Sequence, residues 1–244
     1  MINEILSTWQ ESQSTMETTV TTYKCKYCSK EYRRESTLLA HMCEPKRRHQ
    51  QEKEVGVQFG MQAYLRFYEM TQAVGKPIEF DMFAKSKFYL GFTKFGKHVI
   101  NINAINPEEF IDFVIRNSVK LDKWTSDSVY NTYVQELNRK ESADRAVERS
   151  IILMQKWGEE YDRPFNKFFK EVSKPLALHY IKSGRLSPWV IFNSDNGAEL
   201  IDSFSDHELT LINDYLEPAF WTRKFNARAE DVQFVKMILK KAGV

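Results

Sequence analysis

The chain has 244 residues, and its 35 Lys and Arg nearly balance its 33 Asp and Glu, for a formal net charge of +2. Hydrophobic residues make up 42% of it, but no run of 18 apolar residues occurs. The composition therefore excludes a membrane-spanning helix, and we expect no membrane partner. The length suits one small module followed by one globular domain.

Residues 1–20 contain three acids, no Lys or Arg, and many Ser, Thr and Gln side chains. Little apolar periodicity follows Trp9, so we expect this stretch to be a flexible acidic tail. The first residues lack the basic and apolar regions of a signal peptide. We therefore expect the protein to be cytoplasmic.

All three cysteines of the chain lie within residues 25–43. Two residues separate Cys25 from Cys28, and twelve more precede His41, which is the ligand spacing of a small structural zinc site. Ordinary buried thiols or a disulfide are the alternative, but three cysteines would leave one unpaired. Metal-bound thiolates also suit a reducing compartment. We therefore predict a bound Zn²⁺ ion.

Cys43 and His49 are the two candidates for the fourth ligand. Cys43 follows His41 by only two positions, which a continuous helix would not allow comfortably. Pro45 breaks helices and favours extended backbone at Glu44, so the chain can unwind after His41 and turn Cys43 inward. We favour Cys43 over His49. The predicted ligand set is Cys25, Cys28, His41 and Cys43.

Residues 23–49 resemble a C2H2-type zinc finger, in a C2HC variant if Cys43 is the fourth ligand. Beyond the ligands, Tyr23, Tyr32 and Leu38 stand where that family places its small apolar core. The resemblance implies a ββα-type fold, so we place the finger and its basic extension at residues 21–49. A module this short buries little surface, and we expect the metal to supply most of its folding free energy.

Residues 21–49 carry eight Lys and Arg against three Glu. Some of the bases, together with Ser36, surround the expected start of the finger's helix, where this family meets phosphates and base edges. The rest follow the finger directly and would extend the phosphate contact, unless they form a solvated hinge. We expect Arg33, Arg34, Arg47 and Arg48 to be solvated surface charges. The candidate DNA-binding residues here are Lys30, Arg33, Arg34, Lys46, Arg47 and Arg48.

Residues 50–244 have the pattern of an all-α globular domain, so the expected fold class is mainly α. Asn106 and Pro107, followed by two Glu, are typical of a helix start, and Ser205 with Glu208 forms a capping box. Residues 97–102 and 189–192 are possible strands. We expect seven or eight helices in this domain, among them segments within residues 59–70, 106–114, 126–137, 145–157, 205–216 and 231–241.

Residues 85–98 combine aromatic side chains with lysines. Such a segment could stack bases on its rings and contact phosphates through its lysines, as single-strand-binding surfaces do. In that case at least one ring is exposed beside Lys87 or Lys94. The alternative is a helix whose aromatic side chains face the core while its lysines face water. The residues concerned are Phe88, Tyr89, Phe92 and Phe95, with Lys85, Lys87, Lys94 and Lys97.

Signs of catalysis are few in this sequence. No Gly-rich phosphate loop occurs, and assigning every cysteine to zinc leaves no thiol nucleophile. Asp206, His207 and Glu208 could ligate a metal, but they fall in the capping box, which explains them better. We therefore predict no catalytic residues and a binding protein that is not an enzyme.

A second resemblance involves proteins of large T-even-like tailed phages. The finger and the segments after it resemble a zinc-finger protein type of those phages, and the helical part is similar in pattern to their helicase-loading protein, which does not normally carry this finger. The resemblance implies binding to forked and single-stranded DNA, to a replicative helicase and to a single-strand-binding protein, in the host cytoplasm. The matching stretches are residues 41–48, 56–60, 63–68, 87–92, 110–117 and 180–186.

Two hypotheses about function follow. In the first, the protein is a DNA-binding accessory factor in replication or recombination. In the second, it is a transcription-associated regulatory or interaction protein whose finger docks on a protein partner. One finger covers about three base pairs, so we expect binding directed by DNA structure or by a partner.

Overall fold

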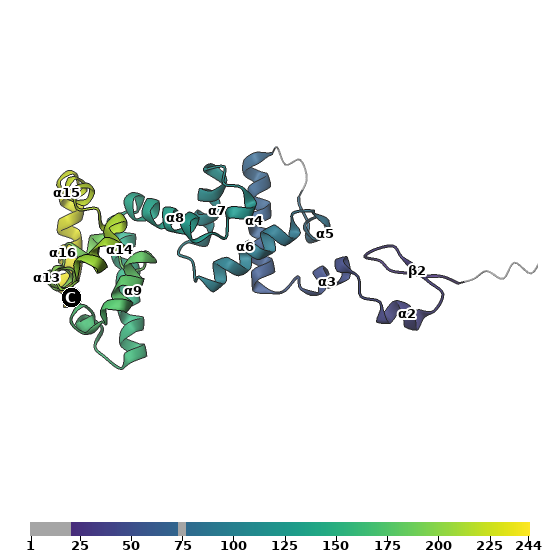
Figure 1. Ribbon diagram of the computed structural model, residues 1–244, viewed down its shortest axis with the longest axis horizontal. Helices are drawn as coiled ribbons and strands as arrows, with labels where there is room; N and C mark the ends of the chain where they lie inside the picture. The colour runs from purple at the N-terminus through teal and green to yellow at the C-terminus, as the bar shows by residue number, and fades with distance from the viewer. Residues whose placement is uncertain (1–20, 73–76) are drawn as a thin grey trace, which may run out of the picture.

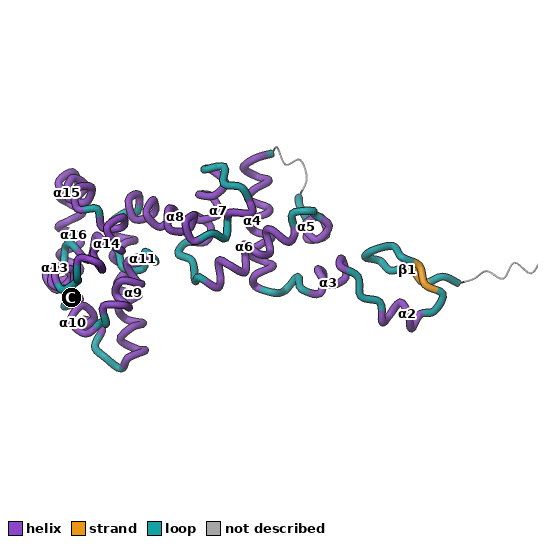
Figure 2. Tube along the Cα trace, in the orientation of Figure 1, coloured by secondary structure: helices purple, strands orange, loops and turns teal. Residues whose placement is uncertain are grey.

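The computed structural model describes residues 21–72 and 77–244. Within them the chain forms fifteen α-helices, two 3-10 helices and one two-stranded hairpin, which confirms the expected mainly α fold (Figures 1 and 2). The hairpin and the first helices form one end of an elongated molecule (Figure 1). The predicted tail, residues 1–20, lies outside the described residues.

The N-terminal module consists of a hairpin and two short helices. Strands β1 (Tyr23–Lys24) and β2 (Glu31–Tyr32) pair antiparallel, with Tyr23 opposite Tyr32. Helix α2 (Glu35–Ala40) follows the hairpin, and α3 (Glu44–Gln50) begins directly after Cys43. Of residues 21–50 only Cys25 is buried, so this module has almost no apolar core of its own.

Two crossing helices, α4 (Val55–Thr71) and α6 (Tyr89–Asn101), form the centre of the next part of the chain (Figure 1). Their backbones approach so closely that a Cβ on Gly96 would clash with the backbone of Gly56 and Gly60. Each helical glycine costs about 1 kcal/mol relative to alanine. The close approach explains why glycine is nevertheless used at these positions.

Trp124 is the centre of the aromatic core beside this crossing. Its ring contacts Phe92 and Phe95 edge-on, with centroid distances of 5.5 Å and 5.0 Å. Its Nε1 donates a hydrogen bond to the carbonyl oxygen of Val119 at 2.8 Å. The elements around it are α5 (Phe80–Lys85), α7 (Pro107–Arg116), the 3-10 helix Leu121–Lys123 and α8 (Asp127–Lys140).

The remaining helices follow α9 (Ala143–Tyr161) and make the other end of the molecule (Figure 1). Trp189 and Trp221 are buried there, with ring centroids 6.1 Å apart. The further elements are the 3-10 helix Phe165–Lys167, α10 (Phe168–Glu171), α11 (Lys174–Lys182), α12 (Pro188–Ile191), α13 (Asp195–Asp202), α14 (Asp206–Leu216), α15 (Pro218–Ala227) and α16 (Ala229–Ala242).

The two expected strands are wrong. Residues 97–101 continue α6, and residues 188–191 form α12. A short apolar run cannot by itself distinguish a buried helix from a strand, and Trp189, Val190 and Ile191 are all fully buried. The expected seven or eight helices were also too few, because one-turn helices such as α10 and α12 are too short to show a helical period.

The predicted helix starts are largely confirmed. The backbone N–H of Glu208 donates to Ser205 Oγ at 3.3 Å, and that of Ser205 donates to Glu208 Oε2 at 2.8 Å, which completes the capping box. At α7 the proline starts the helix, but the side chain of Asn106 caps no backbone N–H. Among the described residues, no helix combines the length and apolarity needed to cross a membrane.

Candidate metal centre

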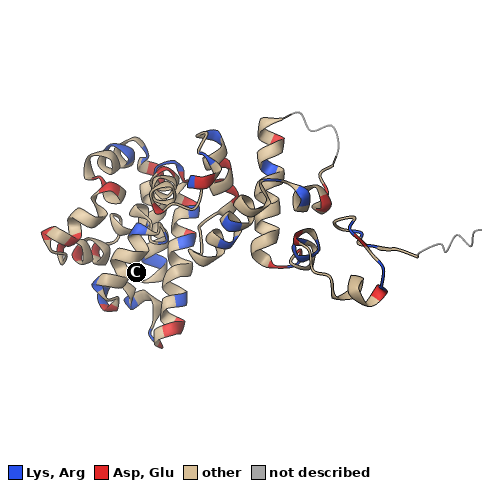
Figure 3. Ribbon diagram, turned by 45° about the vertical axis from the view of Figure 1, so that its right-hand side comes forward, with Lys and Arg blue, Asp and Glu red and all other residues tan. Residues whose placement is uncertain are grey.

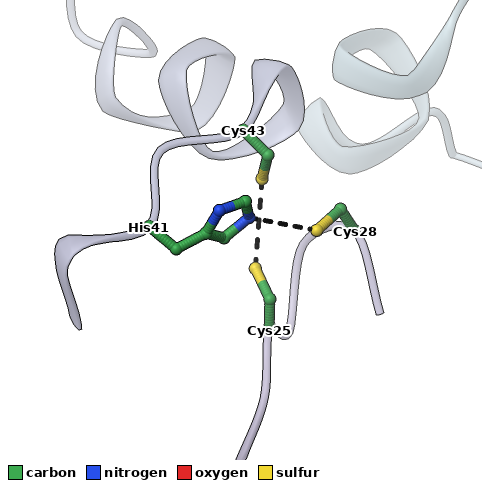
Figure 4. Close-up of side chains that lie close together, drawn as sticks. All are labelled: Cys25, Cys28, His41 and Cys43. Carbon is green, nitrogen blue, oxygen red and sulfur yellow. Dashed lines mark hydrogen bonds between the residues drawn. The ribbon is translucent and has the colours of Figure 1, made fainter. Parts of the chain in front are cut away.

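The first two ligand candidates lie on the turn that closes the hairpin. The backbone N–H of Cys25 donates to the carbonyl oxygen of Lys30 at 2.9 Å, and that of Ser29 donates to the carbonyl oxygen of Cys25 at 2.8 Å. Ser29 has a positive φ of 60°, which reverses the chain. This tight turn directs the thiols of Cys25 and Cys28 toward the same point (Figure 4).

Four candidate ligand atoms converge, all within 4.8 Å of one another (Figure 4). Cys25 Sγ lies 3.9 Å from Cys43 Sγ, and Cys28 Sγ lies 3.3 Å from His41 Nε2. A tetrahedral site with Zn–S near 2.3 Å and Zn–N near 2.0 Å places such pairs about 3.8 Å and about 3.5 Å apart. The cluster therefore has the donors and dimensions that suit Zn²⁺. Four protein ligands leave no open position, which is typical of a structural site.

His41 and Cys43 lie in the short extended segment between α2 and α3. His41 has φ −67° and ψ 125°, and Cys43 has φ −107° and ψ 163°. The helix thus ends at Ala40, one residue earlier than expected, and the extended residues include His41 and Cys43, whereas Glu44 already begins α3. Cys43 faces the other ligands, as expected. Pro45 occupies the first turn of α3, where its missing N–H costs no helical hydrogen bond. It therefore favours the start of a new helix.

Neighbouring side chains support the histidine. The rings of Tyr32 and His41 lie 4.9 Å apart between centroids. Lys46 Nζ donates to the carbonyl oxygen of His41 at 2.9 Å and to that of Leu39 at 3.4 Å, where it compensates the negative end of α2. The three predicted finger-core residues, Tyr23, Tyr32 and Leu38, are only half-buried.

The thiols of Cys25 and Cys43 have different surroundings. The backbone N–H of Cys28 lowers the pKa of the Cys25 thiol; burial opposes this effect, and the N–H of Tyr27 adds to it. Burial raises the pKa of Cys43, and the backbone N–H of Lys46 partly offsets that rise. A bound Zn²⁺ favours the thiolate at each ligand cysteine, because the thiolate is the form that coordinates.

His49, the alternative fourth ligand, faces the helical part of the protein instead. Its ring lies 5.0 Å from that of Tyr27 and 5.3 Å from that of Phe80, between centroids. Its Nε2 lies 3.2 Å from Asp81 Oδ1. His49 is not part of the ligand cluster, so the structure favours Cys43. Sequence spacing could not indicate this contact, because it joins residues 32 positions apart.

The basic residues of the finger fall into two groups. Lys30, Arg33 and Arg34 are exposed, as is Ser36, and in residues 21–72 and 77–244 these three bases form no ion pair. Figure 3 shows Lys and Arg along this part of the chain. Arg47 is exposed but pairs with Glu44. Lys46 is held by the carbonyl groups at the end of α2.

Arg48 is not a solvated surface charge, contrary to the expectation. Only 17% of its side chain is exposed. Its Nη1 donates to the carbonyl oxygen of Ala84 at 2.8 Å, and its guanidinium carbon lies 4.6 Å from the centre of the Tyr89 ring. Its Nε pairs with Glu44 at 3.1 Å. Arg48 therefore joins α3 to α5 and α6.

The aromatic residues of the segment 85–98 divide between core and surface. Tyr89, Phe92 and Phe95 are buried, with exposed fractions of 2%, 2% and 0%. Phe88 is 38% exposed, and Lys87 Nζ lies 4.9 Å from the centre of its ring. The segment is thus chiefly a core helix, with one exposed aromatic side chain beside a lysine.

The four lysines of this segment also differ in their contacts. Lys85 pairs with Asp81 at 2.6 Å, and Lys97 pairs with Glu54 at 3.3 Å. All four are exposed. The lysines that form no ion pair in the described part of the chain are Lys87 and Lys94.

One buried ion pair gave no signal in the sequence. Arg149 pairs with Glu141, whose side chain is 3% exposed, and Arg149 Nε donates to the carbonyl oxygen of Gly184 at 2.9 Å. Burial lowers the pKa of Arg149 to about 10. The pair joins the end of α8 to α9 and to the turn at Gly184, so its visible role is structural.

Outside the Cys3His cluster, the described residues contain no other group of three His, Cys, Asp or Glu placed to hold a metal. His207 is exposed in the first turn of α14, which the capping box explains. No protein-family model, curated protein or solved structure matches the chain. The geometry by itself supports a zinc-finger-like metal site on a small hairpin at one end of a helical protein.

Proposed function

We propose that the protein is a zinc-finger DNA-binding accessory protein acting on forked or single-stranded DNA in phage replication or recombination. The resemblance of the finger to C2H2 and C2HC modules, and of the helical part to phage helicase-loading proteins, supports this proposal. Its partners would be DNA, a replicative helicase and a single-strand-binding protein in the host cytoplasm. It would act by binding, without catalysis.

The observation that carries the proposal is the exposed basic surface beside the metal centre. Lys30 directly precedes β2, and Arg33 and Arg34 directly follow it, close to the metal site that holds the hairpin. Cations that form no ion pair are available to phosphates, and releasing the counterions of DNA supplies much of the binding free energy. A rigid hairpin would hold these cations in place before DNA arrives.

The distribution of charge along the chain also favours the finger end of the molecule as the DNA-binding end. Residues 21–101 contain fifteen Lys and Arg against eight Asp and Glu, whereas residues 102–244 contain twenty against twenty-two. The positive charge is thus concentrated in the finger and the helices next to it. A polyanion would be attracted to this end before specific contacts form.

Binding to single-stranded, duplex and forked DNA at several salt concentrations tests the proposal. We expect affinity to fall steeply as salt rises. Replacing Arg33 and Arg34 with alanine should weaken binding and reduce the salt slope on duplex DNA by about two units. The melting temperature should barely change, because solvated charges contribute little to folding. Alanine at Lys240 and Lys241, an exposed pair in α16, is the matched control. Equal affinity of all three proteins would contradict the proposal.

Phe88 gives a separate test of single-strand binding. A stacked base contributes roughly 1–3 kcal/mol, so Phe88→Ala should lower single-strand affinity about tenfold with little change in stability. Phe95→Ala is the contrasting variant, since truncating a buried Phe costs about 3–5 kcal/mol of folding free energy. Melting curves and binding curves of both variants distinguish the two roles. Unchanged affinity of Phe88→Ala would exclude stacking here.

A second candidate function is supported by two apolar side chains on the finger. Leu39 and Met42 are 71% and 55% exposed. An exposed apolar patch is typical of protein-binding surfaces, and these two side chains lie three positions apart in the sequence. In this alternative the protein is a transcription-associated regulatory factor whose finger docks on a protein. Binding of the protein partner would then be insensitive to salt and would be lost in the double variant Leu39→Ser, Met42→Ser. The wild-type protein would not bind DNA.

A further inference from the structure

The finger is fastened to the helical part through two neighbouring residues. In the described part of the chain, every side-chain hydrogen bond, ion pair and ring contact between residues 21–50 and residues 55–244 uses Arg48 or His49. Arg48 reaches the carbonyl oxygen of Ala84 and the ring of Tyr89, and His49 reaches Phe80 and Asp81. Both residues belong to the last turn of α3.

The other end of α3 begins at a metal ligand. Cys43 is the residue that precedes the helix, and α3 has only seven residues. Isolated helices shorter than roughly 12 residues are marginal in water because the first turn is costly to form. No residue of α3 is buried, so packing alone does not stabilise it. Fixing Cys43 on the metal therefore removes part of the cost of forming this helix.

The metal-binding turn touches the same junction directly. Tyr27 lies between Cys25 and Cys28, and its ring is 5.0 Å from that of His49. His49 in turn is 5.3 Å from the ring of Phe80 on α5. The turn, α3 and α5 thus meet at one histidine, and two routes lead from the metal centre to the helical part.

We propose that the metal and the docking of the finger are thermodynamically coupled: zinc orders α3 and Tyr27, and these hold the finger on α5. Without the metal, α3 loses its fixed start, and Arg48 and His49 lose their positions. The finger then separates from the helical part while the helical part stays folded. The inference relies on the metal site proposed above but is independent of DNA binding.

Coupling of this kind is reciprocal, and this gives a sharp test. If zinc strengthens docking by some factor, then docking strengthens zinc binding by that same factor, so a weakened docking surface must lower zinc affinity. Residues of α5 can be changed without altering any ligand candidate. Phe80→Ala removes the ring that His49 contacts, and Asp81→Asn removes the negative charge that faces His49 Nε2. Met82→Ala changes an exposed side chain on the same helix and serves as the control.

Zinc affinity is measured in the full chain by competition with a chromophoric chelator. We expect Phe80→Ala and Asp81→Asn each to weaken zinc binding about fivefold or more, because typical coupling between two sites changes an affinity by at least about fivefold. Met82→Ala should leave zinc affinity unchanged. Hydrogen exchange gives a second readout. Removing zinc should speed exchange in residues 44–50 and 80–85 and leave residues 89–101 protected.

Equal zinc affinity in both α5 variants and the wild type would overturn the coupling. So would unchanged protection of residues 44–50 after zinc removal. If the wild-type protein held no zinc at all, the metal centre and the coupling would fall together. If zinc affinity responded as expected but DNA did not bind, only the proposed function would be wrong.

Discussion

At the residue scale, the choice between Cys43 and His49 decides what kind of module the finger is. Both residues follow His41 closely enough in the sequence to be the fourth ligand, but in the structure they make different contacts. Cys43 turns toward the other ligands from an extended backbone, and His49 packs between Tyr27 and Phe80. The ring of His49 is thus held by two aromatic neighbours and by Asp81, away from the four converging ligand atoms.

This assignment predicts one zinc ion per chain. Chelation should unfold the finger while the helical part keeps its far-UV circular dichroism, because the finger has almost no core of its own. Cys43→Ala should lower the zinc content, since three ligands leave the tetrahedron open. His49→Ala should retain zinc at high metal concentration. Metal analysis of the purified variants is the measurement, and the reverse pattern would make His49 the fourth ligand.

At the element scale, the closest approach of α4 and α6 depends on glycines. The sequence spaces Gly56 and Gly60 four residues apart, so they share one helix face. Gly96 meets them from the facing helix. In the sequence these glycines are scattered, and their spacing indicates only that they do not form a Gly-rich phosphate loop. Their paired placement explains how Phe92 and Phe95 reach the ring of Trp124.

Gly96→Ala should therefore lower the free energy of unfolding by about 1–3 kcal/mol or more, because its Cβ meets backbone that cannot move aside. Gly91→Ala is the matched control on the same helix. Its Cβ would lie 2.7 Å from Cδ2 of Leu121, the end of a side chain that can rotate. The gain in helix propensity of about 1 kcal/mol should offset that contact. Urea unfolding of both variants checks this, and equal loss would contradict the crossing.

At the scale of the whole molecule, the largely buried side chain of Arg149 joins segments of the helical domain that lie up to 35 positions apart in sequence. Arg149 on α9 pairs with Glu141 after α8 and bonds the carbonyl oxygen of Gly184. The pKa of Arg149 is lowered to about 10 by burial, but the guanidinium is still charged at neutral pH. Such a pair is costly to break because the remaining charge loses its partner.

Arg149→Met should cost about 3–5 kcal/mol, since it leaves the Glu141 carboxylate buried without a cation. The double variant Arg149→Met, Glu141→Gln should recover a large part of that loss, because both charges are then gone. Thermal or chemical unfolding of the single and double variants completes the cycle. If the two substitutions changed the free energy of unfolding additively, the interaction between Arg149 and Glu141 would not contribute to stability.

The ligand set, the hairpin-and-helix order of the finger and the mainly α fold could be predicted from the sequence alone. These features depend on spacing over a few residues: the Cys25–Cys28 turn, the helix break near Pro45, and the capping box at Ser205. Local backbone preferences and ligand chemistry act over that distance. They therefore leave a readable signal in a single chain.

Only the tertiary structure decided the features that depend on distant residues. By its position in the sequence Arg48 resembles the neighbouring surface bases, and only the fold brings Ala84 and Tyr89 beside it. Residues 189–192 have the apolar pattern of a strand, but residues 188–191 form a helix that is buried on all sides. The buried face of α6 is the face that packs on Trp124, a residue that lies outside this helix. Contacts across 30 or more positions follow from how the helices pack, and local spacing does not encode them.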